Sequence, residues 1–203
     1  IYLLPLVMLG LNRLVRDNKG TLFCLSFALT IFANYYIAFF IGIFIVLYYP
    51  VLLFKYYSIK KPSVLLLKTA HAAALGLLSC GLVAFLIIPV WYSLKLTSAS
   101  GESLPSTVTH YFDLFDYIAR HFLFAHPSIR DGMANIASSI SVLILIPVYF
   151  LSSRIHHKVK IWHAAILLIL IASFNTNVAN FVWHGFHFPN QLPFRNSFIY
   201  IFV

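Results

Sequence analysis

The segment HGFHFPNQLPFRN, residues 184–196, concentrates polar side chains between two apolar runs. His184 and His187 carry the side chain whose proton affinity is closest to neutral pH, and Asn190 adds an amide. Arg195 presents a planar fork of donors that matches the oxygens of a phosphate. These residue types together predict a binding site for a polar, anionic substrate.

Two prolines, Pro189 and Pro193, prevent this segment from forming a regular helix, and Gly185 permits a left-handed backbone conformation. At membrane depth, non-helical backbone persists only where protein or a watery cavity satisfies its hydrogen bonds. We therefore predict that the segment lines a cavity, with Arg195 placed to meet an anion. The alternative is an interfacial aromatic belt in which one arginine snorkels to the water.

The spacing of His184 and His187 would bring two imidazoles together on a helix, but this segment is a poor helix former and has no evident third ligand. We predict no metal site and no cofactor. The sequence contains no glycine-rich phosphate loop, nucleophile elbow or paired-cysteine motif.

Acidic residues occur in a second polar segment, HYFDLFDYIARHFLFAHP, residues 110–127. Its aromatic residues recur at helical spacing, which predicts an amphipathic helix on the outer membrane surface. Asp113, Asp116 and Arg120 fall on its polar flank, and Asp116 and Arg120 are expected to pair. The flank is either a solvated, salt-bridged face or an acidic site in which Asp113 or Asp116 binds substrate hydroxyls or acts as a base.

The elements that must position these residues are membrane helices. Hydrophobic residues make up 61% of the 203 residues and charged residues only 9%, which excludes an ordinary soluble domain. The composition predicts an all-α, polytopic bundle of transmembrane helices with extracytoplasmic loops. The net charge of +9 sits in short loops between apolar runs, so it indicates the positive-inside bias and no nucleic-acid partner.

The topology depends on the apolar run at residues 21–54, which as one helix would be about 51 Å long, too long for one crossing. A hairpin that turns at residues 34–36 puts ten Lys and Arg on one side and four on the other, whereas a single crossing gives seven and seven. The positive-inside rule favours the hairpin. The predicted spans are residues 1–12, 21–34, 36–54, 69–94, 134–151, 161–174 and 197–203, with outer loops at 95–133 and 175–196.

The order of three segments, residues 4–49, 81–94 and 184–198, resembles the YfhO-like bacterial membrane proteins of the GT-C glycosyltransferase superfamily. The last segment, HGFHFPNQLPFRNSF, is the most specific of the three. The resemblance implies a multi-pass protein of the bacterial plasma membrane. It also implies transfer of a sugar from an undecaprenyl-phosphate carrier to an envelope polymer such as lipoteichoic acid.

We expect the chain to be a fragment of a longer protein, with the superfamily's acidic catalytic residue in a loop before Ile1. The fragment would then supply substrate binding. We expect Arg195 to hold the carrier phosphate, and His184, His187 and Asn190 to line the sugar or acceptor cavity. The partners expected are membrane lipids, the lipid-linked sugar and the acceptor polymer. The alternatives are a non-catalytic scaffold of an envelope-synthesis complex and a transporter or flippase for a lipid-linked substrate.

Overall fold

The computed structural model describes residues 1–57, 62–97, 103–122, 124–128, 132–189 and 194–203. Over these residues the protein forms ten α-helices and no multi-residue strand, which confirms the all-helical fold. The chain divides into two compact units, Ile1–Thr97 and Ser98–Val203.

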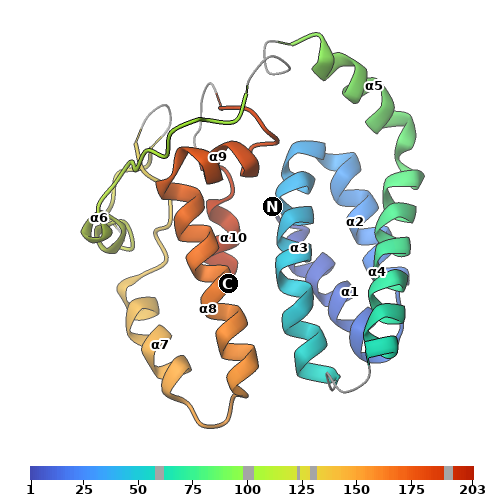
Figure 1. Ribbon diagram of the computed structural model, residues 1–203, viewed down its shortest axis with the longest axis horizontal. Coiled ribbons are helices and arrows are strands. Elements are labelled where there is room, and N and C mark those ends of the chain that lie inside the picture. The colour runs from blue at the N-terminus through green and yellow to red at the C-terminus, as the bar shows by residue number, and fades with distance from the viewer. Residues whose placement is uncertain (58–61, 98–102, 123, 129–131, 190–193) are drawn as a thin grey trace. The chain divides into compact units, whose positions relative to one another are not determined.

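The first unit consists of five helices that follow one another through short connections (Figure 1). They are α1 (Leu4–Asp17), α2 (Thr21–Ala33), α3 (Tyr35–Tyr56), α4 (Pro62–Leu82) and α5 (Ala84–Lys95). α2 packs against α1, α3 and α4, so it is the central helix of this unit.

Gly10 brings α1 and α2 into close contact. A Cβ atom added to Gly10 would lie 2.6 Å from both the Cα and the N of Phe23 on α2, closer than a side-chain carbon can approach. The neighbouring side chains Val7, Leu11 and Leu14 of α1 are buried, as is Phe23. The α1–α2 contact therefore requires glycine at position 10.

Asn34 divides the long apolar run into two helices, at the position where the hairpin turn was predicted. Its backbone is extended, with φ −163°, and its side-chain oxygen accepts a hydrogen bond from the N–H of Ile37 at 3.0 Å. Asparagine is favoured at this N-cap position because it satisfies an amide that the helix leaves open. The helix break is thus observed, and two separate membrane crossings by α2 and α3 stay a prediction.

The apolar run predicted at residues 69–94 differs from the structure at both its start and its middle. α4 begins at Pro62, because proline is accommodated in the first turn of a helix, where amides have no intrahelical partner. The helix is interrupted at Val83, whose backbone is non-helical, with φ −116° and ψ 20°. Val83 is buried against Ala28, Ile31 and Ala38, so packing holds the break in place.

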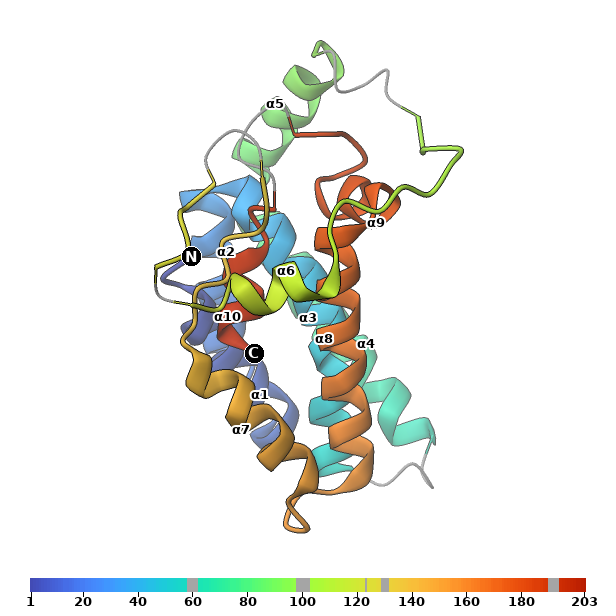
Figure 2. The same ribbon diagram turned by 90° about the vertical axis from the view of Figure 1, so that its left-hand side faces the viewer.

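The second unit contains α6 (Leu114–Ala119), α7 (Ile140–Leu151), α8 (His157–Asn175), α9 (Asn177–Trp183) and α10 (Ser197–Phe202). α8 is its longest helix, and α9 turns away from the end of α8 (Figures 1 and 2). Tyr117, Ile136, Phe174 and Phe194 meet in its buried core.

The apolar run at residues 134–151 forms a shorter helix than predicted. Only residues 140–151 are helical, and Ala134 and Ile136 before them are buried in the core of the unit, with the exposed Asn135 between them. This alternation is that of extended chain, in which successive side chains point in opposite directions. Tertiary packing therefore holds the first third of the run outside the helix.

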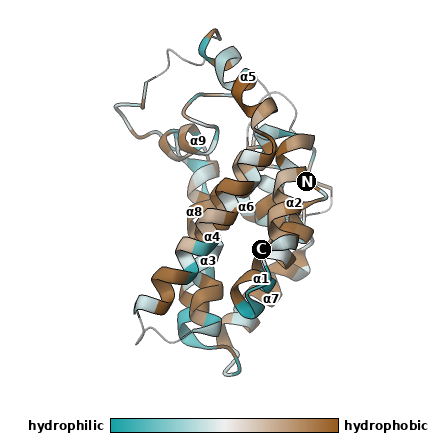
Figure 3. Ribbon diagram, turned by 90° about the vertical axis from the view of Figure 1, so that its right-hand side faces the viewer, coloured by the Kyte–Doolittle hydropathy of each residue, from teal (hydrophilic) through white to brown (hydrophobic). Residues whose placement is uncertain are grey.

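In the part of the chain that the structure describes, three helices are long and apolar enough to cross a membrane: α3, α4 and α8. Three shorter apolar helices accompany them there: α2, α5 and α7. Hydrophobic residues cover most of the length of the helices, while hydrophilic residues gather near their ends (Figure 3). These features support a membrane protein.

The contact at Gly10 makes a testable prediction about stability. Gly10→Ala forces α1 and α2 apart, and we expect it to lower the free energy of unfolding by about 2 kcal/mol. Gly76→Ala is the matched control, because a Cβ at Gly76 of α4 meets no atom within 4 Å and alanine favours helix. Thermal unfolding of the purified variants in one detergent measures both. Equal melting temperatures for the two variants would contradict the close contact.

Candidate functional site

The predicted binding segment begins where α8 ends. Thr176 interrupts the helix with extended backbone, and its hydroxyl donates to the Ala172 carbonyl at 3.0 Å and accepts from the Ala179 amide at 3.3 Å. One side chain therefore closes α8 and caps α9. The threonine sets the direction in which the chain leaves α8.

α9 ends in a Schellman motif formed by residues 184–186. The Gly185 amide donates to the Val182 carbonyl at 3.2 Å, and the Phe186 amide donates to the Phe181 carbonyl at 2.9 Å. Gly185 has φ 78°, the left-handed conformation predicted for it, and Phe186 follows with φ 65°. The rings of Phe181 and Phe186 are 6.2 Å apart, which supplies the apolar contact typical of this motif.

His184 lies at the C-cap of α9 and is fully buried. Its Nδ1 lies 2.8 Å from the Asn180 carbonyl oxygen, so Nδ1 carries the proton in the neutral ring and Nε2 bears the lone pair. Burial lowers the pKa of His184 to about 4, and the charges of His187 and Arg195 contribute to the lowering. The imidazole is therefore neutral at physiological pH.

Phe194 anchors the other end of the segment. It is buried, adopts the left-handed conformation with φ 61°, and packs edge-on against Phe112 and Phe174 with ring centroids 6.1 and 6.0 Å apart. Asn196, also buried, donates its amide to the Ser173 hydroxyl of α8 at 2.8 Å. Arg195 is exposed between these two buried residues, so its backbone is anchored on both sides.

Three of the four predicted binding residues interact electrostatically. His187 and Arg195 both lower the pKa of His184, although burial lowers it more. The His184 side chain is buried, whereas His187 is half-buried and Arg195 is exposed. Their roles stay predictions. Asn190, together with Gln191 and Pro193, lies outside the residues that the structure describes.

The first outer loop is fastened to this site by two asparagines of α8 and α9. The side-chain oxygen of Asn175 accepts from the amides of Tyr111 and Phe112 at 3.1 and 2.9 Å. The Asn177 side chain accepts from the Thr109 amide at 3.0 Å and donates to the Thr107 carbonyl at 2.8 Å. These bonds satisfy four backbone groups of a segment that has no regular structure of its own.

Asp113 and Asp116 form a capping box at the start of α6. The Asp113 amide donates to the Asp116 carboxylate at 3.1 Å, and the Asp113 side chain in turn caps the helix. Both carboxylates are exposed. This structural role explains both acids without a substrate, and a catalytic role for them stays a prediction.

The expected ion pair between Asp116 and Arg120 is replaced by other contacts. Arg120 donates to the Ser128 hydroxyl at 3.1 Å and to the His126 carbonyl. These bonds fold the chain back after α6, which is six residues long, shorter than the helix predicted over residues 110–127. Phe115 and Phe124 of this segment are 80% and 94% exposed, as expected for a segment at the membrane interface.

His121 is a buried residue of the second unit that was not predicted from the sequence. His121 lies between α6 and α10, with Nδ1 2.7 Å from the Tyr117 carbonyl oxygen and Nε2 3.1 Å from the Tyr200 hydroxyl. The only sign of this in the sequence was that His121 follows Tyr117 by four residues, a spacing that puts two side chains on the same face of a helical turn. Within the described ranges, no group of three or more His, Cys, Asp or Glu could hold a metal ion.

Asn177→Ala tests how the loop is fastened. Both hydrogen bonds to the loop are lost, and we expect the Thr109 amide to exchange its hydrogen at least tenfold faster. Asn177→Asp keeps the acceptor for Thr109 and should preserve most of the protection. Hydrogen exchange read by mass spectrometry reports on residues 103–113, and unchanged exchange in the alanine variant contradicts the fastening role.

His184 predicts a loss of stability in acid. Between the ordinary histidine pKa of 6.5 and the folded pKa of about 4, the unfolded chain binds a proton that the folded chain excludes. His184 should therefore reduce the free energy of unfolding by about 3 kcal/mol as the pH falls from 7 to 4. In His184→Gln, the melting temperature should lose this dependence on pH. In His157→Gln, which changes an exposed histidine, the melting temperature should keep it. The same acid slope in both variants would exclude His184 as its source.

Comparison with known proteins identifies the family. The sequence matches the family described as bacterial membrane protein YfhO over residues 1–203. No curated protein and no solved structure matches the chain. With a family match along the whole chain and an all-helical fold rich in apolar helices, the protein belongs to the YfhO family of bacterial membrane proteins.

Proposed function

We propose that the protein is part of a plasma-membrane glycosyltransferase that uses a sugar carried on undecaprenyl phosphate. The acceptor is an extracytoplasmic envelope polymer such as lipoteichoic acid. Membership of the YfhO family is compatible with this activity, and the local arrangement around Arg195 supports it.

The proposal rests on how the residues on either side of Arg195 are anchored. Both neighbours of Arg195 are buried: Phe194 packs its ring against α8, and Asn196 donates a hydrogen bond to α8. The backbone on either side of the exposed guanidinium is therefore anchored. Burial is the main cause of the low pKa of His184, and the nearby His187 and Arg195 contribute to it. An arginine held in this way suits the phosphate of a lipid carrier.

The chemistry would be an inverting displacement at the anomeric carbon of the donor. A carboxylate removes the proton of the acceptor hydroxyl, the new glycosidic bond forms, and the bond to the carrier phosphate breaks. The departing phosphate gains negative charge, which Arg195 offsets. In this scheme His184, being buried, holds the turn that presents His187, and Asn190 remains a candidate contact to the sugar or acceptor.

The test is the sugar content of purified lipoteichoic acid, measured by NMR in cells with the full-length gene, without it, and with single variants. Arg195→Ala should lower the sugar content at least tenfold, because the leaving phosphate loses its cation. Arg195→Lys should keep part of the activity, since it retains the charge and loses the fork.

Arg154→Ala is the matched control, because Arg154 is an exposed arginine on the predicted cytoplasmic side. All variants must be present in the membrane at the level of the unaltered protein. Full glycosylation by Arg195→Ala would favour a scaffold over a transferase with a phosphate clamp. Unchanged sugar in the deletion strain, with no second copy of the gene, would exclude lipoteichoic acid as the acceptor.

A further inference from the structure

An open groove of about 850 Å³ lies in the first unit, where α1 ends and α2 begins. Its polar lining comes from Arg13, Arg16, Asp17 and Lys19, and its apolar lining includes Leu22 and Leu25. Nothing in the proposed transferase chemistry uses this groove, which belongs to a different unit from Arg195.

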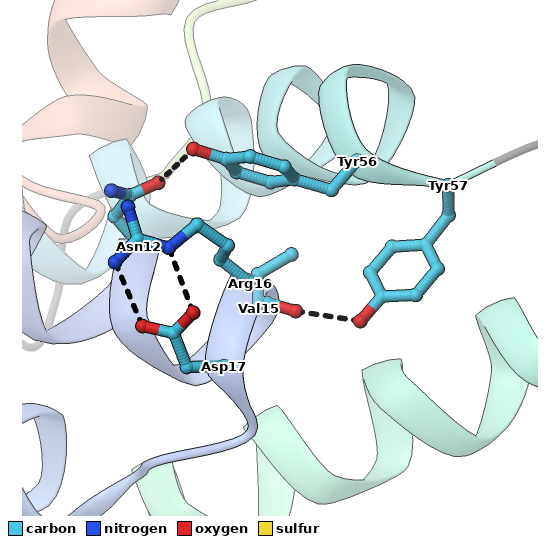
Figure 4. Close-up of polar contacts among 6 residues, drawn as sticks. All are labelled: Asn12, Val15, Arg16, Asp17, Tyr56 and Tyr57. Carbon is cyan, nitrogen blue, oxygen red and sulfur yellow. Dashed lines mark hydrogen bonds and ion pairs between the residues drawn. The ribbon is translucent and has the colours of Figure 1, made fainter.

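The polar end of the groove is positively charged. Three basic side chains face one acid, which leaves a net of two positive charges, and all four side chains are exposed. Asp17 is held by Arg16, whose Nε and a terminal nitrogen each donate to a carboxylate oxygen at 2.8 Å (Figure 4). The pKa of Asp17 is lowered first by this hydrogen bond and further by the charges of Lys19 and Arg13. Arg13 and Lys19 therefore supply the excess charge.

Apolar side chains extend from the groove along both helices. On α2, Leu25, Leu29 and Phe32 are 57%, 51% and 53% exposed and lie at spacings of four and three, which puts them on one face. On α1, Leu6 and Leu9 are also exposed and lead towards Arg13. A cationic end thus continues into two partly exposed apolar tracks, of which the far end on α2 meets α5, with the ring centroids of Phe32 and Phe85 6.2 Å apart.

α1, which forms one side of the groove, is fastened to the end of α3 and to α4. The Tyr56 hydroxyl donates to the Asn12 side chain at 2.9 Å, and the Tyr57 hydroxyl donates to the Val15 carbonyl at 2.7 Å (Figure 4). Lys68 of α4 donates to the Asn18 side chain at 3.1 Å. With the tight contact at Gly10, these bonds fix the end of α1 against its neighbouring helices.

We propose that this groove binds an anionic phospholipid, with its phosphate between Arg13 and Lys19 and an acyl chain along the exposed face of α2. The continuous change from charged to apolar lining distinguishes a lipid from a soluble anion, which would leave the apolar tracks bare. Basic pockets between membrane helices on the cytoplasmic side are suited to anionic headgroups. The charge distribution of the sequence predicts that side for this groove.

The experiment measures lipid binding to the purified full chain by native mass spectrometry. The probes are phosphatidylglycerol, phosphatidylcholine with the same acyl chains, and inorganic phosphate. We expect phosphatidylglycerol to bind in preference to phosphatidylcholine. The double variant Arg13→Gln, Lys19→Gln should bind phosphatidylglycerol about 25-fold more weakly, because each basic residue near the surface contributes roughly a factor of five.

The matched control is Arg154→Gln, Lys158→Gln, which removes two exposed positive charges from the other unit on the same predicted side. It should bind phosphatidylglycerol as the unaltered chain does. An equal loss in both double variants overturns the groove in favour of general surface charge. Binding of inorganic phosphate as strong as that of phosphatidylglycerol overturns the lipid assignment, and so does equal binding of the two lipids.

Discussion

Backbone groups at the ends of the apolar helices must find hydrogen-bond partners inside the protein, and this constraint organises the structure. Lipid offers no partners, so several interruptions of the helices are filled by side chains that replace them. Asparagine meets this need repeatedly: Asn34 caps α3, and Asn175 and Asn177 hold the first outer loop. These three side chains bond to backbone groups, whereas Asn196 joins α10 to α8 through the Ser173 hydroxyl.

The same constraint explains why residues 107–112 of the first outer loop are hydrogen-bonded to α8 and α9. A loop that only connected helices would leave its amides to water, whereas residues 107–112 donate to and accept from side chains of α8 and α9. The Schellman motif and the buried Phe194 then confine the second outer segment from both of its described ends. The backbone that carries Arg195 is consequently anchored by the buried residues beside it.

Positive charge serves different purposes in the two units. Around Arg195, positive charge acts on a neutral, buried histidine. At the α1–α2 junction an acid is present, but it is held by Arg16, and the remaining cations stand over apolar helix faces. The first arrangement suits a phosphate that leaves during a reaction, and the second suits a lipid headgroup that stays.

The sequence by itself determined the membrane class, the helical fold, the family resemblance, the break at Asn34 and the left-handed turn at Gly185. Each of these follows from composition or from the conformational preference of one residue, and such preferences act over a few neighbouring positions. Tertiary structure decided the shortened α7, the break at Val83 and the burial of His184. These depend on which side chains meet across distances of many residues, as Ile136 meets Phe174, and periodicity carries no information about such partners. An apolar run therefore shows that a segment avoids water, and only packing decides where within that run the helix begins and ends.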